Sequence, residues 1–470
     1  MEKAELVVIG AGPGGLSAAV KAASMGANVT ILDQNARIGG QIFRQFEKGF
    51  SITDAEALGK DYQKGQDIFE RFKQLESKIT YLNRASVWGI FDHNRIAYAR
   101  DGQSRTVEFK NLVIASGAYD RPVPFPGWTL PGVFTAGGAQ NLVKNQRVLP
   151  GKKILLAGTG PLQLVVAHQL ISNGAEVVAI LEAGDVKGHL LQLTKGVIGN
   201  WHYVTDGLRY MKTIRKAGVP IMRNHLIIRA NGTEHVNEAV IARVDENWRA
   251  IPGTEKTFDV DAVCIGYGLV TSTELTRLAE CEHVYDGSLG GYIPVRSENM
   301  ETTRKGVFAV GDGAGVAGSE VAVLEGEIAG IAAASSLGHT LDTEKANEMS
   351  AVQSRLVRYE VFRRAMDEIS RPRPGLYELA EDDTVICRCE DVTYGQIKTL
   401  AKREGIKAKD IKRETRTGMG SCNGKICSTI LINLLHDLSA QTREQPEGLN
   451  IRPPVRPVSL GVLAGTGDNR

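Results

Sequence analysis

The stretch from Leu6 to Asp33 constrains the fold of this chain more than any other. Residues 6–9 are a short apolar run rich in β-branched side chains, which predicts a buried parallel strand. A glycine-rich turn of the form G-x-G-x-x-G follows, then an Ala-rich helix predicted from Leu16 to Met25, and a second strand that ends at Asp33. This order of elements is typical of a Rossmann-like dinucleotide-binding unit.

The residues of this turn suit the binding of a pyrophosphate. Gly10 permits the tight turn, Gly12 lets the backbone approach the phosphates, and Gly15 lets the helix and the strand pack closely. The helix N-terminus offers N–H groups to the phosphates. Asp33 lies 18 residues after Gly15, where an acid accepts hydrogen bonds from ribose hydroxyls. The alternative is a glycine-rich turn without a ligand. The predicted contact residues are Gly10, Gly12, Pro13, Gly14, Gly15 and Asp33.

The composition is that of an ordinary globular protein. The 470 residues suffice for roughly two or three domains, and 42% of them are hydrophobic and 23% charged. The net charge of +2 gives no sign of nucleic-acid or membrane-surface binding. No apolar run reaches about 18 residues, so we expect no membrane span. The first strand begins at Leu6 and leaves no room for a signal peptide, so we expect a cytoplasmic protein.

Three later segments resemble signatures of the two-dinucleotide-binding flavoproteins. Residues 34–41 are similar to the x-R-x-G-G-Q turn that borders FAD in that superfamily, residues 112–118 to its apolar strand with a small-residue turn, and residues 303–312 to its late FAD signature. The resemblance implies that the chain binds FAD and that Asp312 hydrogen-bonds the ribityl chain of the flavin. Asp312 is also placed to cap the helix predicted after it, and the two roles are compatible.

The resemblance adds contact residues to the FAD site. They are Gln34, Arg37, Gly40, Gln41, Ser116, Gly117, Gly311 and Asp312. Val87 is assigned only by its position, as a residue whose backbone contacts the adenine. Between the signatures, strand-like runs at Ile79–Leu82, Ala85–Ile90, Arg95–Ala99 and Thr106–Phe109 predict a small β-meander inserted before the strand at residue 112. An amphipathic helix is predicted near residues 55–75.

A second strand-turn-helix-strand unit occupies residues 152–182. Its turn ends in Gln163, where the first turn has its third glycine, and a Gln there keeps helix and strand further apart. Glu182 lies at the tip of the second strand, where it suits a ribose 2′-hydroxyl and opposes a 2′-phosphate. The unit therefore leaves three alternatives open: a bound NAD, another adenine nucleotide, or an empty structural domain. The predicted contacts are Gly158, Gly160 and Glu182.

The six cysteines fall into two classes. Cys264 and Cys281 stand alone and are predicted to be buried apolar residues. The other four form a C-x-C…C-x4-C pattern with 32 residues between the pairs: Cys387, Cys389, Cys422 and Cys427. Four thiolates in two pairs can form a tetrahedral zinc site or hold a [2Fe–2S] cluster with one pair per iron, and unligated thiols are the third alternative. No C-x-x-C pair lies beside either nucleotide fold, which excludes a disulfide relay of the thioredoxin-reductase type there.

The segment around these four cysteines resembles the bacterioferritin-associated-ferredoxin-like domain. That domain has a C-x-C pair, helices, and a Gly-rich loop that carries the second pair, as in Gly418–Cys427 here. The resemblance implies that Cys387, Cys389, Cys422 and Cys427 bind a [2Fe–2S] cluster. A flavin in the same chain favours a redox cluster over zinc.

One further segment narrows the family. Residues 117–133 are similar to the Y-D-R-x-x-P-F-P-G-W-x-x-P-G-V stretch of the flavoprotein α (A) subunits of multimeric amino-acid dehydrogenases. This group includes opine oxidases, dye-linked proline and hydroxyproline dehydrogenases, and hydrogen cyanide synthase. The resemblance covers nearly the whole chain. It implies a hetero-oligomer in which a flavoprotein β subunit of the glycine- or sarcosine-oxidase type oxidises the C–N bond of the substrate. Some complexes add a small ferredoxin-like subunit.

By this resemblance the chain is an electron-transfer subunit. Electrons from an amine oxidised in the partner would reach the cluster, then the FAD, then an external acceptor. The first alternative is a self-contained NAD(P)H:acceptor oxidoreductase that uses the second nucleotide domain, and Gln163 argues against it. The second alternative is a non-catalytic assembly scaffold. The sequence does not name the substrate, because the substrate pocket would lie in another chain.

The predicted fold class is α/β. We expect a two-dinucleotide-binding-domain flavoprotein, in which a second Rossmann-like domain is inserted into the FAD domain, followed by a small helical [2Fe–2S] domain. The predicted division is residues 1–125 for the first part of the FAD-binding domain, 126–280 for the second nucleotide-binding domain, 281–345 for the return of the FAD-binding domain, 346–380 for a helical connector, 381–440 for the [2Fe–2S] domain and 441–470 for an extended C-terminal arm.

Overall fold

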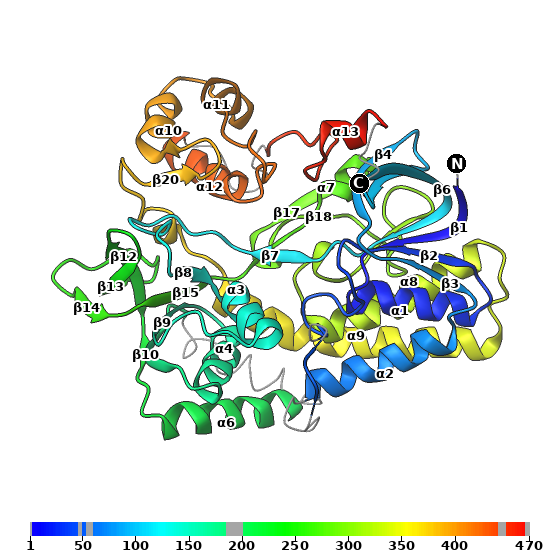
Figure 1. The fold of residues 1–470 in the computed structure, drawn as a ribbon, viewed down its shortest axis with the longest axis horizontal. Helices are drawn as coiled ribbons and strands as arrows, with labels where there is room; N and C mark the ends of the chain where they lie inside the picture. Colours follow the sequence, from blue (N-terminus) through cyan, green and yellow to red (C-terminus); the bar gives the residue numbers. More distant parts are fainter. Residues whose placement is uncertain (1, 46–48, 53–59, 185–200, 440–447, 466–470) are drawn as a thin grey trace. The chain divides into compact units, whose positions relative to one another are not determined.

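The structure of the protein is a computed structural model that describes residues 2–45, 49–52, 60–184, 201–439 and 448–465. The chain folds into two compact units, each built from separate segments of the sequence (Figure 1). Unit 1 comprises Met1–Ala118, Thr271–Tyr359 and Ile451–Arg470. Unit 2 comprises Tyr119–Val270 and Glu360–Asn450. The α/β fold class is confirmed, and the finer division into six segments stays a prediction.

A mostly parallel sheet forms the core of unit 1, in the order β3-β2-β1-β6-β5-β4, with β19 beside β6. The second half of β1, residues 6–9, is buried on both faces, and so is β2 apart from the half-buried Thr30, as a sheet covered on both faces requires. After β3 the chain continues on the other side of β1, so a topological switch point lies between β1 and β6, where α/β sheets bind ligands. The strands are β1 (Glu2–Ile9), β2 (Val29–Leu32), β3 (Ile79–Leu82), β4 (Ser86–Phe91), β5 (Arg95–Arg100), β6 (Gln103–Ile114) and β19 (Val307–Ala309).

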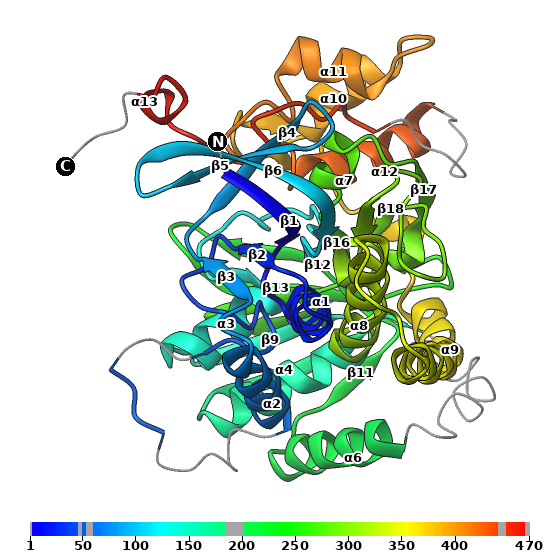
Figure 2. The same cartoon turned by 90° about the vertical axis from the view of Figure 1, so that its right-hand side faces the viewer.

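The helices of unit 1 include a tightly packed pair, α1 and α8, which lie side by side in Figures 1 and 2. Glycines on α8 allow this approach, because a Cβ at Gly326 would lie 2.2 Å from the carbonyl oxygen of Gly14. A Cβ at Gly330 would lie 2.4 Å from that of Ala18. The remaining elements of unit 1 are α1 (Pro13–Ser24), α2 (Lys60–Gln74), α7 (Glu274–Leu278), β17 (His283–Asp286), β18 (Gly291–Pro294), α8 (Ser319–Ser336) and the first part of α9 (Thr343–Ser370).

The predicted four-stranded meander is wrong in two respects. The run at Ile79–Leu82 is β3, which pairs parallel with β2 and belongs to the nucleotide-binding sheet. The run at Thr106–Phe109 is not a separate strand, because it continues into the strand at residue 112 as the twelve-residue β6. Only β4, β5 and the first half of β6 pair antiparallel. The start of the helix predicted near residues 55–75 lies outside the described residues, and α2 covers the rest.

Unit 2 contains a second Rossmann-like sheet, all parallel, in the order β11-β10-β9-β15-β8. A three-stranded antiparallel sheet, β12-β13-β14, accompanies it, and its strand β14 was not predicted. The elements are β8 (Val133–Thr135), α3 (Ala136–Asn141), β9 (Lys153–Gly158), α4 (Pro161–Ser172), β10 (Glu176–Glu182), α6 (Trp201–Lys216), β11 (Ile221–Arg223), β12 (His225–Gly232), β13 (Val236–Arg243), β14 (Lys256–Asp259) and β15 (Ala262–Gly266). The strands β7 (Ala118–Asp120) and β16 (Leu269–Thr271) pair with each other.

The cysteine-rich part of unit 2 is mainly helical and is drawn in orange in Figure 1. Its apolar side chains belong to the same buried cluster as the wall of the second Rossmann-like sheet, since Ile386 and Leu431 share that cluster with Phe125 and Ile265. Its elements are β20 (Val385–Cys387), β21 (Val392–Thr393), α10 (Tyr394–Ala401), α11 (Ala408–Thr415) and α12 (Cys427–Ser439). The connector α9 enters unit 2 at residue 360.

The described part of the C-terminal tail packs on its own chain. Leu449 is buried in the apolar cluster of unit 2. In unit 1, Val455 is buried, and its N–H donates to the carbonyl oxygen of Trp88 on β4 at 2.9 Å. A short helix, α13 (Leu460–Leu463), follows. No helix in the described ranges is both long and apolar enough to cross a membrane.

Candidate cofactor sites

The first glycine turn has no room for side chains at the positions that pack strand on helix. A Cβ at Gly15 would lie 1.9 Å from the carbonyl oxygen of Gly10. Gly10 itself has a φ of +99°, and a Cβ there would lie 2.3 Å from the carbonyl oxygen of Ala115. The helix α1 then begins at Pro13 with Gly12 as its N-cap. The turn therefore presents bare backbone and the N-terminus of a twelve-residue helix to a ligand.

The predicted FAD-bordering turn lies against this backbone. The N–H of Gly39 donates to the carbonyl oxygen of Ala11 at 2.8 Å. A Cβ at Gly40 would lie 2.6 Å from the Cα of Gly12, so the two glycines face each other without side chains. Of the other predicted residues of the turn, Gln34 and Gln41 are exposed and Arg37 is half-buried.

Asp33 holds the tip of β2 to the glycine turn. Its Oδ2 accepts from the N–H of Ala11 at 2.5 Å, and its Oδ1 accepts from the N–H of Asn35 at 2.6 Å. Burial raises the pKa of Asp33, and these hydrogen bonds oppose the rise. The carboxylate is thereby fixed at the carboxyl end of β2, where an acid recognises ribose in this fold.

The two later signatures reach the same edge of the sheet. The N–H of Val310 donates to the carbonyl oxygen of Ile114, which joins the strand ends of β19 and β6. A Cβ at Gly313 would lie 2.6 Å from the Oγ of Ser116 and 2.9 Å from the N of Gly117, so these two turns are in contact. The structure thus brings together the glycine turn and the predicted residues Ser116, Gly117, Gly311 and Asp312.

The capping role expected of Asp312 is wrong, because the N-cap of α8 is Gly318 and no side chain of the described residues caps this helix. Asp312 instead holds the loop before the helix. Its Oδ1 accepts from the N–H groups of Ala317 and Gly318 at 3.0 and 2.9 Å, just before α8 begins at Ser319. Burial raises the pKa of Asp312 despite these two bonds. No group within the described ranges donates a hydrogen bond to Oδ2, which suits the predicted role toward a flavin hydroxyl.

A buried ion pair that the sequence analysis missed supports this turn. Glu325 on α8 is 3% exposed, and its Oε2 accepts from the N–H of Gly311 at 2.7 Å. Its Oε1 accepts from Arg296 Nη2 at 2.6 Å, and Arg296 Nη1 also donates to the carbonyl oxygen of Ala309 at 3.0 Å. In the sequence, an acid within the apolar run of α8 hints at such a pair. Its partner Arg296 lies 29 residues away, so spacing alone does not identify it.

Val87 lies on β4, and its side chain is in the apolar core. The chain just before it runs beside Asp33, because the N–H of Ala85 donates to the carbonyl oxygen of Asp33 at 2.8 Å. Its contact with the adenine stays a prediction.

The second glycine turn differs from the first where its third glycine is missing. Gln163 is 1% exposed, and its amide nitrogen would lie 2.2 Å from a Cβ at Gly158. Glu182 occupies the predicted place at the tip of β10 and accepts from the N–H groups of Gly160 and Gly184 at 3.1 and 2.8 Å. Burial raises the pKa of Glu182. Whether these residues contact a nucleotide stays a prediction.

The four C-terminal cysteines form two pairs, and each pair joins the first motif to the second. Cys427 lowers the pKa of Cys387 and Cys389 raises the pKa of Cys422, each through a contact between the two thiols. Each pair therefore takes one cysteine from C-x-C and one from C-x4-C. Within the ranges that the structure describes, no three Cys, His, Asp or Glu side chains gather as ligands of a single metal ion. Two pairs suit the two irons of a [2Fe–2S] cluster better than one tetrahedral zinc site.

The backbone around Cys387 is shaped to hold a thiolate, whereas burial raises the pKa of Cys422, and the Cys387 thiol and burial raise the pKa of Cys427. A hydrogen bond from Cys427 lowers the pKa of Cys387 to about 5, together with N–H groups of Gly418, Glu390 and Cys389 and against the effect of burial. Because the thiolate is the form that binds iron, these donors prepare Cys387 as a ligand. A Cβ at Gly420 would lie 2.1 Å from the Cβ of Cys389, so the loop approaches as closely as glycine alone allows. Cys264 and Cys281 are buried as predicted.

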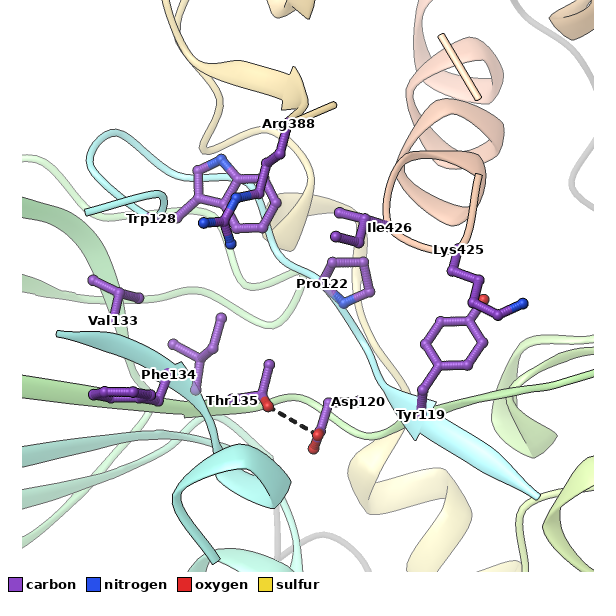
Figure 3. Close-up of a pocket in the computed structure, with 11 residues that line it drawn as sticks. Tyr119, Asp120, Pro122, Trp128, Val133, Phe134, Thr135, Arg388, Lys425 and Ile426 are labelled. Carbon is purple, nitrogen blue, oxygen red and sulfur yellow. Dashed lines mark hydrogen bonds between the residues drawn. The ribbon is translucent and has the colours of Figure 1, made fainter. Parts of the chain in front are cut away.

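A pocket in unit 2 lies beside the cysteine loops. It has a volume of about 110 Å³ and is lined partly by the segment 119–133, which the sequence singled out, and partly by Arg388, Lys425 and Ile426 (Figure 3). The Arg388 guanidinium lies over the Trp128 ring at 5.7 Å, and Trp128 Nε1 donates to the carbonyl oxygen of Val385 at 2.8 Å. The segment 119–133 is thus a packing surface for the loops that carry Cys387 and Cys427.

Two family models match separate segments of the chain, one with the nucleotide folds and one with the four clustered cysteines. The family model of the pyridine nucleotide-disulphide oxidoreductases matches residues 4–338. The chain belongs to this family. After the part that matches this family, residues 385–437 match the model of the BFD-like [2Fe-2S] binding domain. The four predicted cysteine ligands all lie in that range.

Two relatives match this family member over nearly its whole length. It is 32% identical to the A component of opine oxidase from Agrobacterium tumefaciens (strain Ach5), over 98% of this chain and 91% of that protein. It is 29% identical to the HcnB component of hydrogen cyanide synthase from Pseudomonas aeruginosa, over 98% of both chains. The crystal structure of L-proline dehydrogenase from P. horikoshii has the same fold, with a TM-score of 0.71, 19% identity, and coverage of 98% of this chain and 80% of that one.

The chain is therefore an oxidoreductase with FAD and a [2Fe–2S] cluster as cofactors. The bare backbone of the first turn and the paired cysteines fit these two groups. FAD supplies two-electron chemistry when it is bound, and the cluster supplies one-electron transfer. This member of the family does not have a C-x-x-C pair beside either nucleotide fold.

Proposed function

We propose that this chain is the electron-transfer subunit of a heteromeric amino-acid dehydrogenase. It receives electrons from an amine that a partner subunit oxidises and delivers them to an external acceptor. The partner is a flavoprotein β subunit of the glycine- or sarcosine-oxidase type, in some complexes with a small ferredoxin-like subunit, and the substrate is a proline-, hydroxyproline- or opine-like amino acid. The reaction takes place in the cytoplasm.

The observation that carries this proposal is the pairing of the four cysteines. A relay between a two-electron substrate and a separate acceptor needs a one-electron group and a flavin, and this one polypeptide contains both. The pairs Cys387–Cys427 and Cys389–Cys422 supply the ligands of that group. The named relatives are themselves subunits, and the chain matches them over nearly their whole length, which supports a role inside a larger complex.

The chain's own residues have defined tasks in this function. Gly10, Gly12 and Gly40 leave room for the pyrophosphate of FAD, and Asp33 is fixed for the ribose. Glu325 orients the N–H of Gly311 and with it the Asp312 turn. In unit 2, the N–H groups around Cys387 stabilise negative charge on sulfur.

One feature favours a second function, that of an NAD(P)H:acceptor oxidoreductase. The second glycine turn is formed, and Glu182 lies at the tip of β10 as an NAD site requires. Gln163 opposes this function, because its buried side chain fills the space beside Gly158.

Amine-dependent dye reduction tests the proposal. The chain purified alone, with its FAD and cluster, is compared with the native complex using L-proline, L-hydroxyproline and an opine as substrates and dichlorophenolindophenol as the acceptor. We expect the complex to reduce the dye with one of these amines and the lone chain to show none of this activity, while dithionite bleaches the flavin and cluster bands of both. Full amine dehydrogenase activity of the lone chain would refute partner dependence.

A further inference from the structure

The second glycine turn is covered by another part of unit 2. A Cβ at Gly160 would lie 2.6 Å from the Oγ of Ser370, the last residue of the connector helix α9. A Cβ at Gly184 would lie 2.7 Å from the carbonyl oxygen of Ile369. In a Rossmann site the second glycine is the point at which the backbone approaches the pyrophosphate. The end of α9 therefore lies over the phosphate-binding surface.

Burial and hydrogen bonds fix the end of α9 in this place. Ala365 and Ile369 on its last turns are 5% and 3% exposed. The N–H of Gly375 then donates to the carbonyl oxygen of Asn247 at 2.9 Å, and Leu376 is fully buried. The hydroxyl of Tyr377 accepts from Arg121 Nη1 at 3.1 Å. A segment anchored by buried side chains on both sides of Ser370 is part of the fold of unit 2 rather than a loosely held cover.

The described residues beneath the end of α9 open no other surface for a pyrophosphate. Gln163 takes the place of the third glycine, and its side chain fills the space beside Gly158. The N–H of Gly160 donates to Glu182 at 3.1 Å, so this donor is engaged within the protein. The side chain of Ser370 thus lies close to the N-terminus of α4.

We propose that the second Rossmann-like domain binds the chain's own connector in place of a dinucleotide. Ser370 and Ile369 occupy the space over Gly160 and Gly184 that a pyrophosphate and a ribose would take. The domain serves as the socket for α9, the helix that leads into the cysteine-rich part of unit 2. NAD(P)H then has no site on this surface, and the chain receives its electrons by another route.

A double-mutant cycle tests the socket. Gly160→Ala places a methyl group against Ser370, whereas Ser370→Gly removes the side chain that it meets. We expect Gly160→Ala to lower the melting temperature of the holoprotein. The part of this loss that comes from the positive φ of Gly160, +85°, should remain in the Ser370→Gly background, and the part that comes from the contact with Ser370 should disappear. Gly174→Ala is the matched control, because Gly174 also has a positive φ, +90°, but a Cβ there meets nothing within 4 Å. Its effect should be equal in both backgrounds.

Equal losses from Gly160→Ala with and without Ser370 would overturn the proposal. The second measurement is the nucleotide content of the denatured wild-type holoprotein and its titration with NADH, NAD⁺ and ATP, which needs no variant to fold. We expect FAD as the only adenine nucleotide and no saturable binding of the added ones. One further equivalent of bound adenine nucleotide would refute the socket. Because no amine or partner is used, this result is independent of the proposed electron-transfer function.

Discussion

The first and second glycine turns each lie between a strand and a helix, yet different kinds of segment pack over them. Over the first turn lies another glycine, since the Cα of Gly40 would be 3.7 Å from a Cβ at Gly12. Over the second lies the hydroxyl of Ser370, 2.6 Å from a Cβ at Gly160. One turn faces a glycine of the next loop, and the other faces a helix end.

The difference teaches that the local motif does not decide what packs over the turn. Asp33 and Glu182 both lie at a strand tip, and both accept N–H bonds from their own glycine turn. What differs is the third glycine, Gly15 against Gln163, and the segment that packs above. Fold and function therefore separate within one chain, as they do between proteins that share a fold.

The largest expected effect concerns the [2Fe–2S] cluster of unit 2. Cys387→Ala removes a ligand from one cysteine pair, so we expect complete loss of the cluster absorption and of its paramagnetic resonance signal. The flavin bands should remain, because they belong to the first turn. Cys281→Ala, which changes a buried cysteine outside the motifs, is the control and should keep the cluster. An intact cluster in Cys387→Ala would contradict the ligand assignment.

The next effect distinguishes the third position of the two turns. Gly15→Ala forces a methyl group to within 1.9 Å of a backbone oxygen, and overpacking typically costs about 1–3 kcal/mol, occasionally more. We expect loss of bound FAD, measured as the flavin absorbance per chain. Gln163→Ala, at the equivalent position of the second turn, should keep a full equivalent of FAD. The comparison fails if both variants retain flavin equally.

A smaller effect is expected from the support of the Asp312 turn. Glu325→Gln leaves Arg296 without its carboxylate, and breaking a buried pair costs roughly 3 kcal/mol. We expect that loss in chemical denaturation, together with weaker FAD retention. Lys64→Ala removes an exposed pair with Glu320 and should cost less than about 1 kcal/mol. Similar losses in the two variants would show that the buried pair has no special role.

The smallest effect compares the two acids at the strand tips. Asp33→Asn weakens the hydrogen bonds from Ala11 and Asn35 and the contact with ribose, which corresponds to about 1.5–3 kcal/mol in FAD binding. Equilibrium dialysis of FAD measures this change. Glu182→Gln should leave FAD affinity unchanged and lower only thermal stability. A drop in FAD affinity in Glu182→Gln would break the distinction between the turns.

The sequence predicted the parts of both sites that depend on local spacing. The glycine turns, the acids at residues 33 and 182 and the four cysteines follow from motifs that are read along the chain. Asp312 was expected to cap α8, but it bonds to the loop that precedes the helix. Short motifs of this kind carry their own backbone requirements, such as the positive φ of Gly10.

The features that escaped prediction depend on residues that are distant in sequence. Ser370 meets Gly160 across 210 residues, and nothing in either segment announces the contact. The contact of Cys387 with Cys427 joins the C-x-C segment to the C-x4-C segment, which spacing does not reveal. The strand β3 was assigned to a meander because a four-residue run does not show whether it pairs parallel or antiparallel.

The most direct test of partner-fed electron transfer is an anaerobic visible spectrum of the purified holoprotein before and after adding NADH. The account predicts flavin bands and a broad cluster absorption that NADH leaves unchanged, while the native complex is bleached by its amine substrate. Prompt bleaching of the lone chain by NADH would contradict it. That result would make the second glycine turn a working coenzyme site and the chain an NAD(P)H:acceptor oxidoreductase.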